Sequence, residues 1–355
     1  MMKKLLLLLL FTSLAPVVQA QRAAALTALL ARHQVPGMQV VYVRGRHVES
    51  YSLGVREDAG SQPVTDTTIF EAASLGKQML AYVALRLCDQ GVLDLDKPLL
   101  AYYAYPRVQG QSCAARITAR LVLTHTAGLP NWAVNPLGAD WAASPLRVAY
   151  APDSCWSYSG EGYAWLQQTL EHLTGHSWEE LAQAHIFEPL GLKHSSFAWQ
   201  PRYAASASAG HDGSGQVVPI DHFAAPNAGF SLYSTATDYS CFLQALRTGR
   251  GLRPATARLL RTPATPASRC GQPASATDPY IDWACGVGLA ATSRGLAQWQ
   301  WGDNGNFKGF FMTLPGKQES LLLLTNSSNG PKLVDEVLAL FFGAGEYRAT
   351  QWLRE

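Results

Sequence analysis

A serine and a lysine stand three residues apart, Ser74 and Lys77, at the start of the apolar segment SLGKQMLAYVAL. In a helix this spacing puts both side chains on one face of the first turn. A hydroxyl beside an amine is a nucleophile beside a base if burial or a cation lowers the pKa of the amine. The positive end of the helix dipole would favour that deprotonated amine. The alternative is structural, with Ser74 as an N-cap and Lys77 as an ordinary solvated side chain.

A tyrosine can share proton transfer with such a lysine. Tyr158 stands in WSYSGEGYAWLQQTLEHLTG, just before the next strongly helical segment. The chain has 14 tyrosines, so spacing alone does not separate a catalytic Tyr158 from one that packs in a core or a loop. A serine hydrolase also needs donors for the oxyanion that forms on the substrate carbonyl.

The sequence around the histidines favours structural roles over catalytic ones. His125, in LTHTAGLP, is expected in a loop, and a Ser-x-x-Lys pair needs no histidine base. His172 and His176 have the i, i+4 spacing of a metal pair, but Gly175 between them is typical of a helix end. The H-E-x-x-H pattern is absent, so we expect no metal site, and acyl transfer to a serine needs no organic cofactor. No G-x-S-x-G motif is present, which argues against an α/β-hydrolase fold.

The composition describes a large chain with little net charge. The 355 residues are 48% hydrophobic, which is ample for one large domain or two interleaved ones. The formal net charge is +2, and Lys3 and Lys4 account for it, since the chain has 28 basic and 26 acidic side chains. No run of basic residues occurs, which argues against a nucleic-acid partner.

Residues 1–20, MMKKLLLLLLFTSLAPVVQA, have the pattern of a secretory signal peptide. Two lysines precede an apolar run, and the run is followed by a segment that ends in the small residue Ala20, as at a cleavage site. The alternative is a membrane anchor, but the run is short for a spanning helix of ~20 residues. We therefore expect cleavage near Ala20, a periplasmic or secreted protein, and no stable membrane span in the mature chain.

Six cysteines in an exported chain permit disulfides. Nearness in sequence favours Cys88–Cys113 and Cys270–Cys285, with buried free thiols as the alternative. No C-x-x-C pair occurs, which argues against zinc-ribbon or thioredoxin chemistry. The six are Cys88, Cys113, Cys155, Cys241, Cys270 and Cys285.

The order of expected elements indicates one sheet built from both ends of the chain. A helical pattern at 22–33 precedes two strands at 37–54, and a strong helix follows at 75–90. Helical segments and long loops fill most of 95–270, and a final helix is expected at 331–342. Between these lie four strand-like segments, ACGVGLAAT, LAQWQWG, GFFMTLP and ESLLLLTNSS.

This order predicts an α/β (α+β) fold in which terminal helices flank an antiparallel sheet and a mainly helical region is inserted. We expect one domain at 21–355, with a sheet region at 21–73 and 275–355 and a helical region at 74–274. A site would lie in the cleft between the two regions, where Ser74 leaves the sheet region.

Several segments, in order, resemble the serine β-lactamase and penicillin-binding protein family, in its class C-like and esterase-like branch. The similarity covers nearly all of residues 30–345. The segments are FEAASLGKQMLAYVALRLCDQGVLDLDKPL, ITARLVLTHTAGLPNW, WSYSGEGYAWLQQTLEHLTG, IFEPLGLKHSSF, AGFSLYSTATDYSCFLQAL and WQWGDNGNFKGFFMTLPGKQESLLLLTNSSNG.

The resemblance implies the β-lactamase/transpeptidase-like fold and a role for each catalytic residue. Ser74 would be acylated, Lys77 would activate it, and Tyr158 would act in proton transfer to the leaving group and in deacylation. The backbone N–H of Ser74 would make half of the oxyanion hole. The strand that carries the family's third motif would make the other half.

Two motifs depart from the family pattern. The third, usually Lys-Thr-Gly or His-x-Gly, is either Gln300-Trp301-Gly302, with the N–H of Asp303 as the second oxyanion donor, or Asp303-Asn304-Gly305. We prefer the first; in both, the cation that faces a substrate carboxylate is missing. In the second motif, usually Tyr-x-Asn, Gly160 replaces the asparagine and cannot hydrogen-bond a substrate amide.

The sequence therefore predicts an exported serine hydrolase that acts through an acyl-Ser74 intermediate without a cofactor. Fewer polar anchors favour an ester or small amide substrate, ahead of a D-amino-acid peptide and a β-lactam. The alternatives are a β-lactamase or D-alanyl-D-alanine carboxypeptidase, and a catalytically weak binding protein that keeps the fold. The partner would be a small-molecule, peptide or ester substrate.

Overall fold

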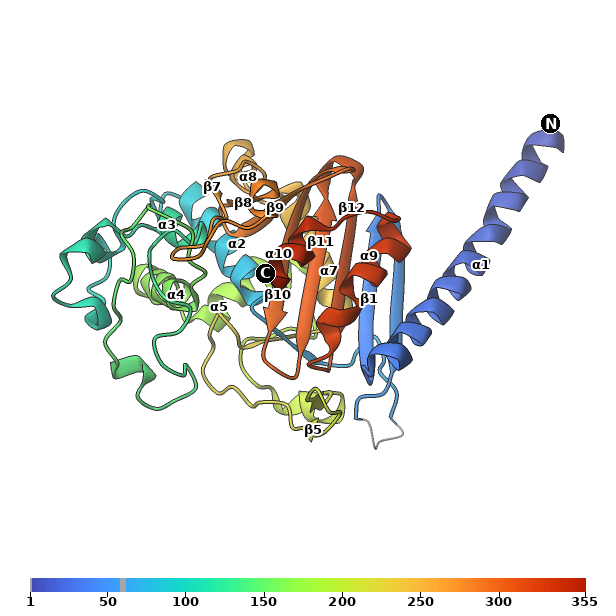
Figure 1. Cartoon of the computed structure of the whole chain (residues 1–355), viewed down its shortest axis with the longest axis horizontal. Coiled ribbons are helices and arrows are strands. Elements are labelled where there is room, and N and C mark those ends of the chain that lie inside the picture. The colour runs from blue at the N-terminus through green and yellow to red at the C-terminus, as the bar shows by residue number, and fades with distance from the viewer. Residues whose placement is uncertain (1, 58–61) are drawn as a thin grey trace.

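The computed structural model describes residues 2–57 and 62–355, with side chains from residue 16 onward. Its centre is an eight-stranded antiparallel sheet in the order β2-β1-β12-β11-β10-β9-β8-β7 (Figure 1). The strands are β1 (Gly37–Arg44), β2 (His47–Gly54), β7 (Thr265–Pro266), β8 (Ile281–Ala284), β9 (Val287–Thr292), β10 (Gly295–Asp303), β11 (Lys308–Leu314) and β12 (Glu319–Thr325). β1 pairs with β12, which confirms that both ends of the chain build one sheet.

Two small sheets and the helices complete the fold. β3 (Phe70–Ala73) pairs with β6 (Leu232–Ser234), and β4 (Gly210–His211) pairs with β5 (Val217–Val218). The helices are α1 (Met2–His33), α2 (Gly76–Asp89), α3 (Ala119–Leu123), α4 (Gly160–Thr174), α5 (Trp178–Ala182), α6 (Glu188–Leu190), α7 (Ala236–Thr248), α8 (Pro254–Leu259), α9 (Val334–Phe342) and α10 (Arg348–Arg354).

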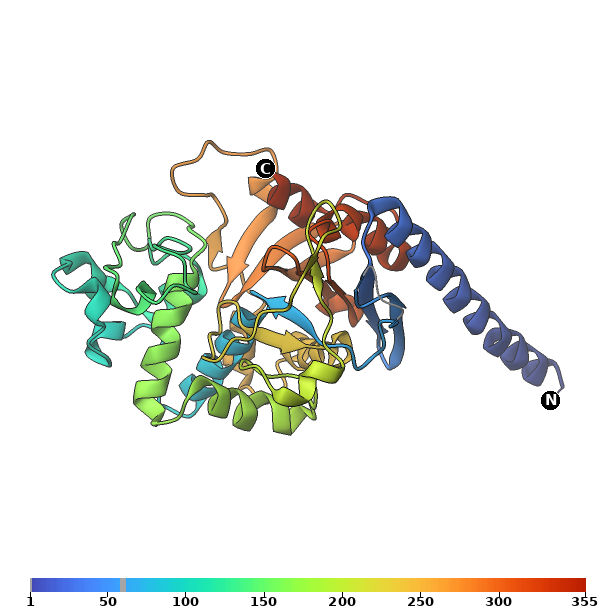
Figure 2. The same ribbon diagram turned by 90° about the horizontal axis from the view of Figure 1, so that it is seen from below.

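The two faces of the central sheet pack against different helices. Side chains alternate along each strand, so Leu321 and Leu323 of β12 join a core with α1, α9 and α10. Leu322 and Leu324 join the opposite core, with α2, α4 and α7. Figure 2 shows the helical region beside the sheet and the first turns of α1 projecting away from the body. This arrangement brings β3 and the start of α2 against the face of the sheet that carries Leu322 and Leu324.

The observed elements match the strand predictions more closely than the helix predictions at the two ends. The predicted helix at 22–33 ends correctly at His33 but begins at Met2, so α1 includes the expected signal segment. The final helix α9 begins at Val334 after a short 3₁₀ turn, and α10 follows it without having been predicted. Within residues 2–57 and 62–355, no helix is long and apolar enough to cross a membrane.

The disulfide prediction was wrong. Cys155 pairs with Cys270, 115 residues away along the chain, with 5.3 Å between their Cα atoms. Cys88, Cys113, Cys241 and Cys285 are free thiols. Nearness in sequence misled the prediction, because the strand-like contact between Trp156 and Arg269 aligns the two distant segments. The crosslink therefore fastens the segment just before Tyr158 to the edge of the sheet.

Candidate active site

Ser74 lies in the sharp turn between β3 and α2. The pairing of β3 with β6 shifts register between Glu71 and Ala73. Ala73 then adopts φ of +50°, a left-handed conformation that residues other than glycine adopt rarely and that the surrounding structure must hold. The N-cap position of α2 belongs to Leu75, which makes no side-chain cap. The structural interpretation of Ser74 as an N-cap is therefore wrong.

Lys77 is completely buried beneath Ser74. Its Nζ donates to Ser74 Oγ at 2.8 Å and to the carbonyl oxygen of Gly229 at 2.7 Å. The Ser74 hydroxyl also donates to the Gly229 carbonyl, at 3.0 Å. Burial lowers the pKa of Lys77 to about 7, because the charged amine loses its hydration. A large share of Lys77 is thus an uncharged amine at neutral pH, with a lone pair for the Ser74 proton.

The phenol of Tyr158 closes this polar cluster. Lys77 Nζ lies 4.9 Å from the centre of the Tyr158 ring, and Nε2 of Gln300 donates to the phenol oxygen at 3.2 Å. Burial raises the pKa of Tyr158, while hydrogen bonds with Ser74 and Gln300 oppose that rise without cancelling it. The phenol therefore keeps its proton at neutral pH. The structure brings together the three side chains that the sequence singled out.

The two registers of the third motif have different places in the fold. Gln300, Trp301 and Gly302 lie on β10, whereas Asn304 lies in the turn that follows it. Gln300 is completely buried beside Tyr158, and the Trp301 ring packs on the Tyr158 ring with 4.7 Å between centres. These contacts support the register Gln300-Trp301-Gly302.

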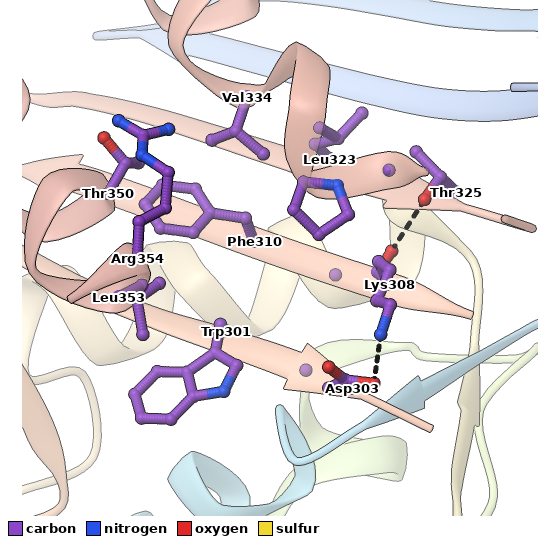
Figure 3. Close-up of a pocket in the computed structure, with 14 residues that line it drawn as sticks. Trp301, Asp303, Lys308, Phe310, Leu323, Thr325, Val334, Thr350, Leu353 and Arg354 are labelled. Carbon is purple, nitrogen blue, oxygen red and sulfur yellow. Dashed lines mark hydrogen bonds and ion pairs between the residues drawn. The ribbon is translucent and has the colours of Figure 1, made fainter. Parts of the chain in front are cut away.

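The expected oxyanion site lies where β10 passes the nucleophile turn. A Cβ on Gly302 would lie only 2.4 Å from the carbonyl oxygen of Ala72, so glycine allows this close approach. Asp303, the next residue, lines the same pocket as Ser74. Its carboxylate forms an ion pair with Lys308 (Figure 3). The backbone N–H groups of Ser74 and Asp303 are thus the candidate donors to the oxyanion.

Gly160 is the first residue of α4, and a tryptophan covers it. A Cβ at Gly160 would lie 2.2 Å from the indole of Trp132, far below any normal contact. A Cβ at Gly229 would meet the same indole at 2.9 Å. The indole therefore occupies the space in which a larger side chain at position 160 would stand.

Glu161 does not point at the nucleophile. It is completely buried and forms a two-pronged ion pair with Arg107, with N–O distances of 2.5 and 3.0 Å. Its Oε1 also accepts from the backbone N–H of Ala133 and from Nε1 of Trp141, each at 3.0 Å. Such a fully paired buried carboxylate is a structural anchor. It fixes the loop that carries Trp132.

A cavity of about 430 Å³ opens over Ser74. Its lining is mostly aromatic and amide in character, with two carboxylates. The residues are Ser74, Asn131, Trp132, Asn135, Pro136, Leu137, Tyr158, Asp221, Phe223, Phe230, Trp301, Asp303 and Asn304. The cavity is large enough for a small organic substrate.

Glu71 ties three segments of the site together. Its two carboxylate oxygens accept from the backbone N–H of Asp221 at 2.9 Å and from Nδ2 of Asn304 at 2.6 Å. Burial raises the pKa of Glu71 to about 7, and the Asp221 carboxylate adds to the rise, while the two hydrogen bonds oppose it. Ionised Glu71 thus links the end of β3, just before Ser74, to the segment at Asp221 and to the turn that follows β10.

A second cavity, of about 180 Å³, lies on the other face of β10 and β11, beneath α9 and α10 (Figure 3). Phe310, Leu323, Val334 and Leu353 line it, and Trp301 borders both cavities. Ser74 does not reach it. It is therefore separate from the reacting groups.

The histidines have the structural roles that the sequence favoured. His125 Nδ1 accepts from the backbone N–H of Ser159 at 3.1 Å, and burial lowers the pKa of His125. His172 packs on Tyr103, and Gly175 caps α4 in the left-handed conformation. The described part of the chain holds no cluster of His, Cys, Asp or Glu side chains that would bind a metal ion.

Neither the Gly229 carbonyl nor Glu71 was predicted from the sequence. A carbonyl acceptor and a buried carboxylate carry no sequence pattern, because tertiary contacts define them. The packing of the Trp132 indole over Gly160 and Gly229 likewise appears only in the structure.

The sequence profile of the beta-lactamase family matches residues 22–341. Esterase EstB of Burkholderia gladioli is 26% identical over 277 residues, which cover 64% of this chain and 70% of the esterase. Penicillin-binding protein 4 of Amycolatopsis lactamdurans is 28% identical over 176 residues, which cover 47% of this chain and 46% of that protein. The match thus spans less than half of the penicillin-binding protein.

Solved structures share the architecture at lower identity. A class C beta-lactamase superposes with a TM-score of 0.74 at 18% identity, over 91% of this chain and 96% of that one. D-alanine carboxypeptidase AmpC from Burkholderia cenocepacia superposes with a TM-score of 0.75 at 19% identity, over 92% and 99% of the two chains. At these identities the likeness concerns the fold, and it confirms the fold predicted from the sequence.

Proposed function

The chain belongs to the beta-lactamase family of serine hydrolases, and we propose that it hydrolyses esters or small amides of uncharged acids through an acyl-Ser74 intermediate. The observation that carries this proposal is the buried Lys77, whose Nζ lies 2.8 Å from Ser74 Oγ. A pKa of about 7 makes this amine a competent base at neutral pH.

In the first half of the reaction, Ser74 Oγ attacks the substrate carbonyl carbon while its proton passes to Lys77 Nζ. Charge develops on the carbonyl oxygen, within reach of the N–H groups of Ser74 and Asp303. The intermediate then collapses. The bond from carbon to the leaving group breaks, the leaving oxygen or nitrogen takes a proton from the Lys77–Tyr158 pair, and an ester remains on Ser74.

In the second half, water repeats the attack on this ester. Its proton passes to Lys77, and the carbon–oxygen bond to Ser74 breaks as Ser74 Oγ regains a proton. Tyr158 keeps its proton at neutral pH because burial raises its pKa. We therefore assign the base to Lys77, and to Tyr158 the transfer of protons toward the departing atom.

The charges around the pocket support an uncharged substrate. Among the pocket-lining residues in the described chain, the charged side chains are Asp221 and Asp303, both acidic. Gln300 offers an amide to Tyr158 and no cation. A substrate that ends in a carboxylate would find no counter-charge there, so D-amino-acid peptides and β-lactams rank below neutral esters. The similarity to an esterase supports ester hydrolysis as the reaction.

We also propose that the mature protein lies outside the cytoplasm, in the periplasm or the medium. Residues 1–20 support this location, and the Cys155–Cys270 disulfide is of the kind that persists in oxidising compartments. Mass spectrometry of protein recovered from its own host would find a first residue near Gln21; an intact Met1 on protein in the cytoplasm would contradict the proposal.

The proposed function is tested by turnover of p-nitrophenyl acetate, p-nitrophenyl butyrate and nitrocefin by mature protein. We expect turnover of both esters and a much lower rate with nitrocefin. Faster nitrocefin than ester turnover would favour the β-lactamase alternative. The absence of any turnover would favour a binding protein that keeps the fold.

Replacing Gln300 with Lys is expected to shift substrate preference. A cation beside Tyr158 would lower the pKa of the phenol and supply a partner for a substrate carboxylate. We expect the ratio of kcat/KM for nitrocefin to that for p-nitrophenyl butyrate to rise by about tenfold, the value of one charge-assisted contact. Gln300→Met, of similar length but uncharged, is the control. An equal ratio in both variants would contradict the role given to position 300.

Replacing Glu71 with Gln is expected to lower kcat/KM for p-nitrophenyl butyrate by roughly tenfold, the equivalent of one hydrogen bond. A glutamine can accept only one of the two bonds that Glu71 accepts, because its amide nitrogen would meet an N–H donor. Stopped assays from pH 5.5 to 9 give a second readout. Activity that needs neutral Lys77 and ionised Glu71 rises more steeply below pH 7 in the wild type than in Glu71→Gln. Parallel profiles would refute the link between Glu71 and the site.

A further inference from the structure

The Trp132 indole lies directly on the backbone segments that hold the catalytic groups. It covers Gly229, whose carbonyl binds both Ser74 and Lys77. It also covers Gly160, the second residue after Tyr158. Lys77 Nζ is 6.0 Å from the centre of the indole. Trp132 is half-buried and lines the cavity above Ser74, so one face of it is available to a substrate.

A rigid anchor holds this indole in place. Backbone atoms on both sides of Trp132 bond to the start of α4: Ala133 N–H donates to Glu161 Oε1 at 3.0 Å, and the Asn131 carbonyl accepts from Glu161 N–H at 2.9 Å. The Asn131 side chain accepts from Gly160 N–H at 3.0 Å. Because the Glu161 carboxylate is itself buried and paired with Arg107, the position of the indole is fixed before substrate arrives.

The surface beside the indole is also aromatic. Phe230 packs edge-on against Trp132 with 5.7 Å between ring centres, and Phe223 packs against Phe230 at 5.3 Å. Both line the cavity. At position 160, where a polar side chain could bind a substrate amide, there is only a glycine. This wall offers a mainly apolar surface to an acyl group.

We propose that the acyl group of the substrate packs against the Trp132 indole, which makes Trp132 the residue that selects esters of uncharged, apolar acids. This inference rests on the proposed acyl-Ser74 chemistry and names its substrate class. The Asp221 carboxylate at the same cavity adds discrimination, because it repels an acyl chain that ends in a carboxylate.

The test compares p-nitrophenyl acetate with p-nitrophenyl butyrate. Each methylene moved from water onto an apolar surface is worth roughly fourfold in binding. We expect the wild-type ratio of kcat/KM, butyrate to acetate, to be about tenfold or more. Trp132→Ala should reduce this ratio toward one, mainly through the KM for butyrate, and Trp132→Phe should keep most of it. A butyrate analogue whose chain ends in a carboxylate, mono-p-nitrophenyl glutarate, should be hydrolysed at least about tenfold less efficiently by the wild type.

The outcomes separate the two proposals. If Trp132→Ala loses acetate and butyrate turnover by the same factor, or keeps the wild-type ratio, the indole is structural and this inference is wrong while the acyl-Ser74 chemistry stands. If the wild type hydrolyses the glutarate ester as well as the butyrate ester, the assigned substrate class is wrong. If the wild type hydrolyses no ester and forms no adduct with a fluorophosphonate, both proposals fail together.

Discussion

Ser74→Ala is expected to lower kcat/KM for p-nitrophenyl butyrate by roughly 10³-fold or more. The change removes Oγ, the atom placed to attack the substrate carbonyl, which lies 2.8 Å from the Lys77 amine and 3.0 Å from the Gly229 carbonyl. An alanine methyl group can neither form the ester nor pass a proton to Lys77. The backbone turn at Ala73 is unaffected, because its conformation comes from the pairing of β3 with β6.

The control for this experiment is Ser154→Ala. Ser154 is exposed near the disulfide, and its hydroxyl donates to the Ala151 carbonyl at 2.7 Å, so removal of that hydroxyl should leave turnover within about twofold of the wild type. Both variants should melt near the wild-type temperature. If Ser74→Ala keeps more than a tenth of the activity while Ser154→Ala behaves as expected, another nucleophile is at work.

Lys77→Met is expected to lower kcat/KM by roughly 10³-fold, within the usual range for the loss of a general base. Methionine fills a similar volume but has no lone pair that accepts the Ser74 proton. The variant should also be more stable than the wild type near pH 8. The pKa of Lys77 falls from its ordinary 10.5 to about 7 on folding. Between those values the unfolded chain binds a proton that the folded chain does not, so burial of the lysine destabilises the fold.

This linkage fixes the sign of two pH effects. Wild-type stability should increase with pH from about 7 toward 10, and the increase should be smaller in Lys77→Met, as measured by urea unfolding at several pH values. Wild-type kcat/KM should rise with pH through about 7 as Lys77 loses its proton. Lys77→Arg, which stays protonated, should be as inactive as Lys77→Met. A Lys77→Met protein that is active, or that unfolds more easily than the wild type at pH 8, would contradict the assignment.

The strands of the sheet were predicted well because the residue types and turn signals of each segment indicate a strand without knowledge of its partners. The segment at 37–54 has β-branched and aromatic residues around a glycine turn, and it forms β1 and β2 as expected. The helix α10 was not predicted, because it is short and is stabilised by the packing of Trp352 against the sheet. The disulfide was mispredicted since Cys155 and Cys270 meet only through tertiary pairing.

The same division applies to the site. Ser74 and Lys77 were singled out by their spacing, and Tyr158 by the resemblance of its segment to the family's tyrosine motif. The structure brings the three together around the Lys77 amine. The contacts that hold the pocket in shape were not predicted, because they join segments far apart in the chain, such as Glu71 with Asn304, 233 residues later. The departure at Gly160 was visible in the sequence, but its cause, the Trp132 indole, became clear only from packing.

The most direct test of the acyl-Ser74 account is intact-mass analysis of the mature protein after reaction with a fluorophosphonate, followed by peptide mapping. The account predicts one adduct per chain, on Ser74, that is absent from Ser74→Ala and strongly slowed in Lys77→Met. An adduct on another residue, or the absence of both an adduct and ester turnover in the wild type, would contradict it. The buried Lys77 would then be a remnant in a fold kept for binding.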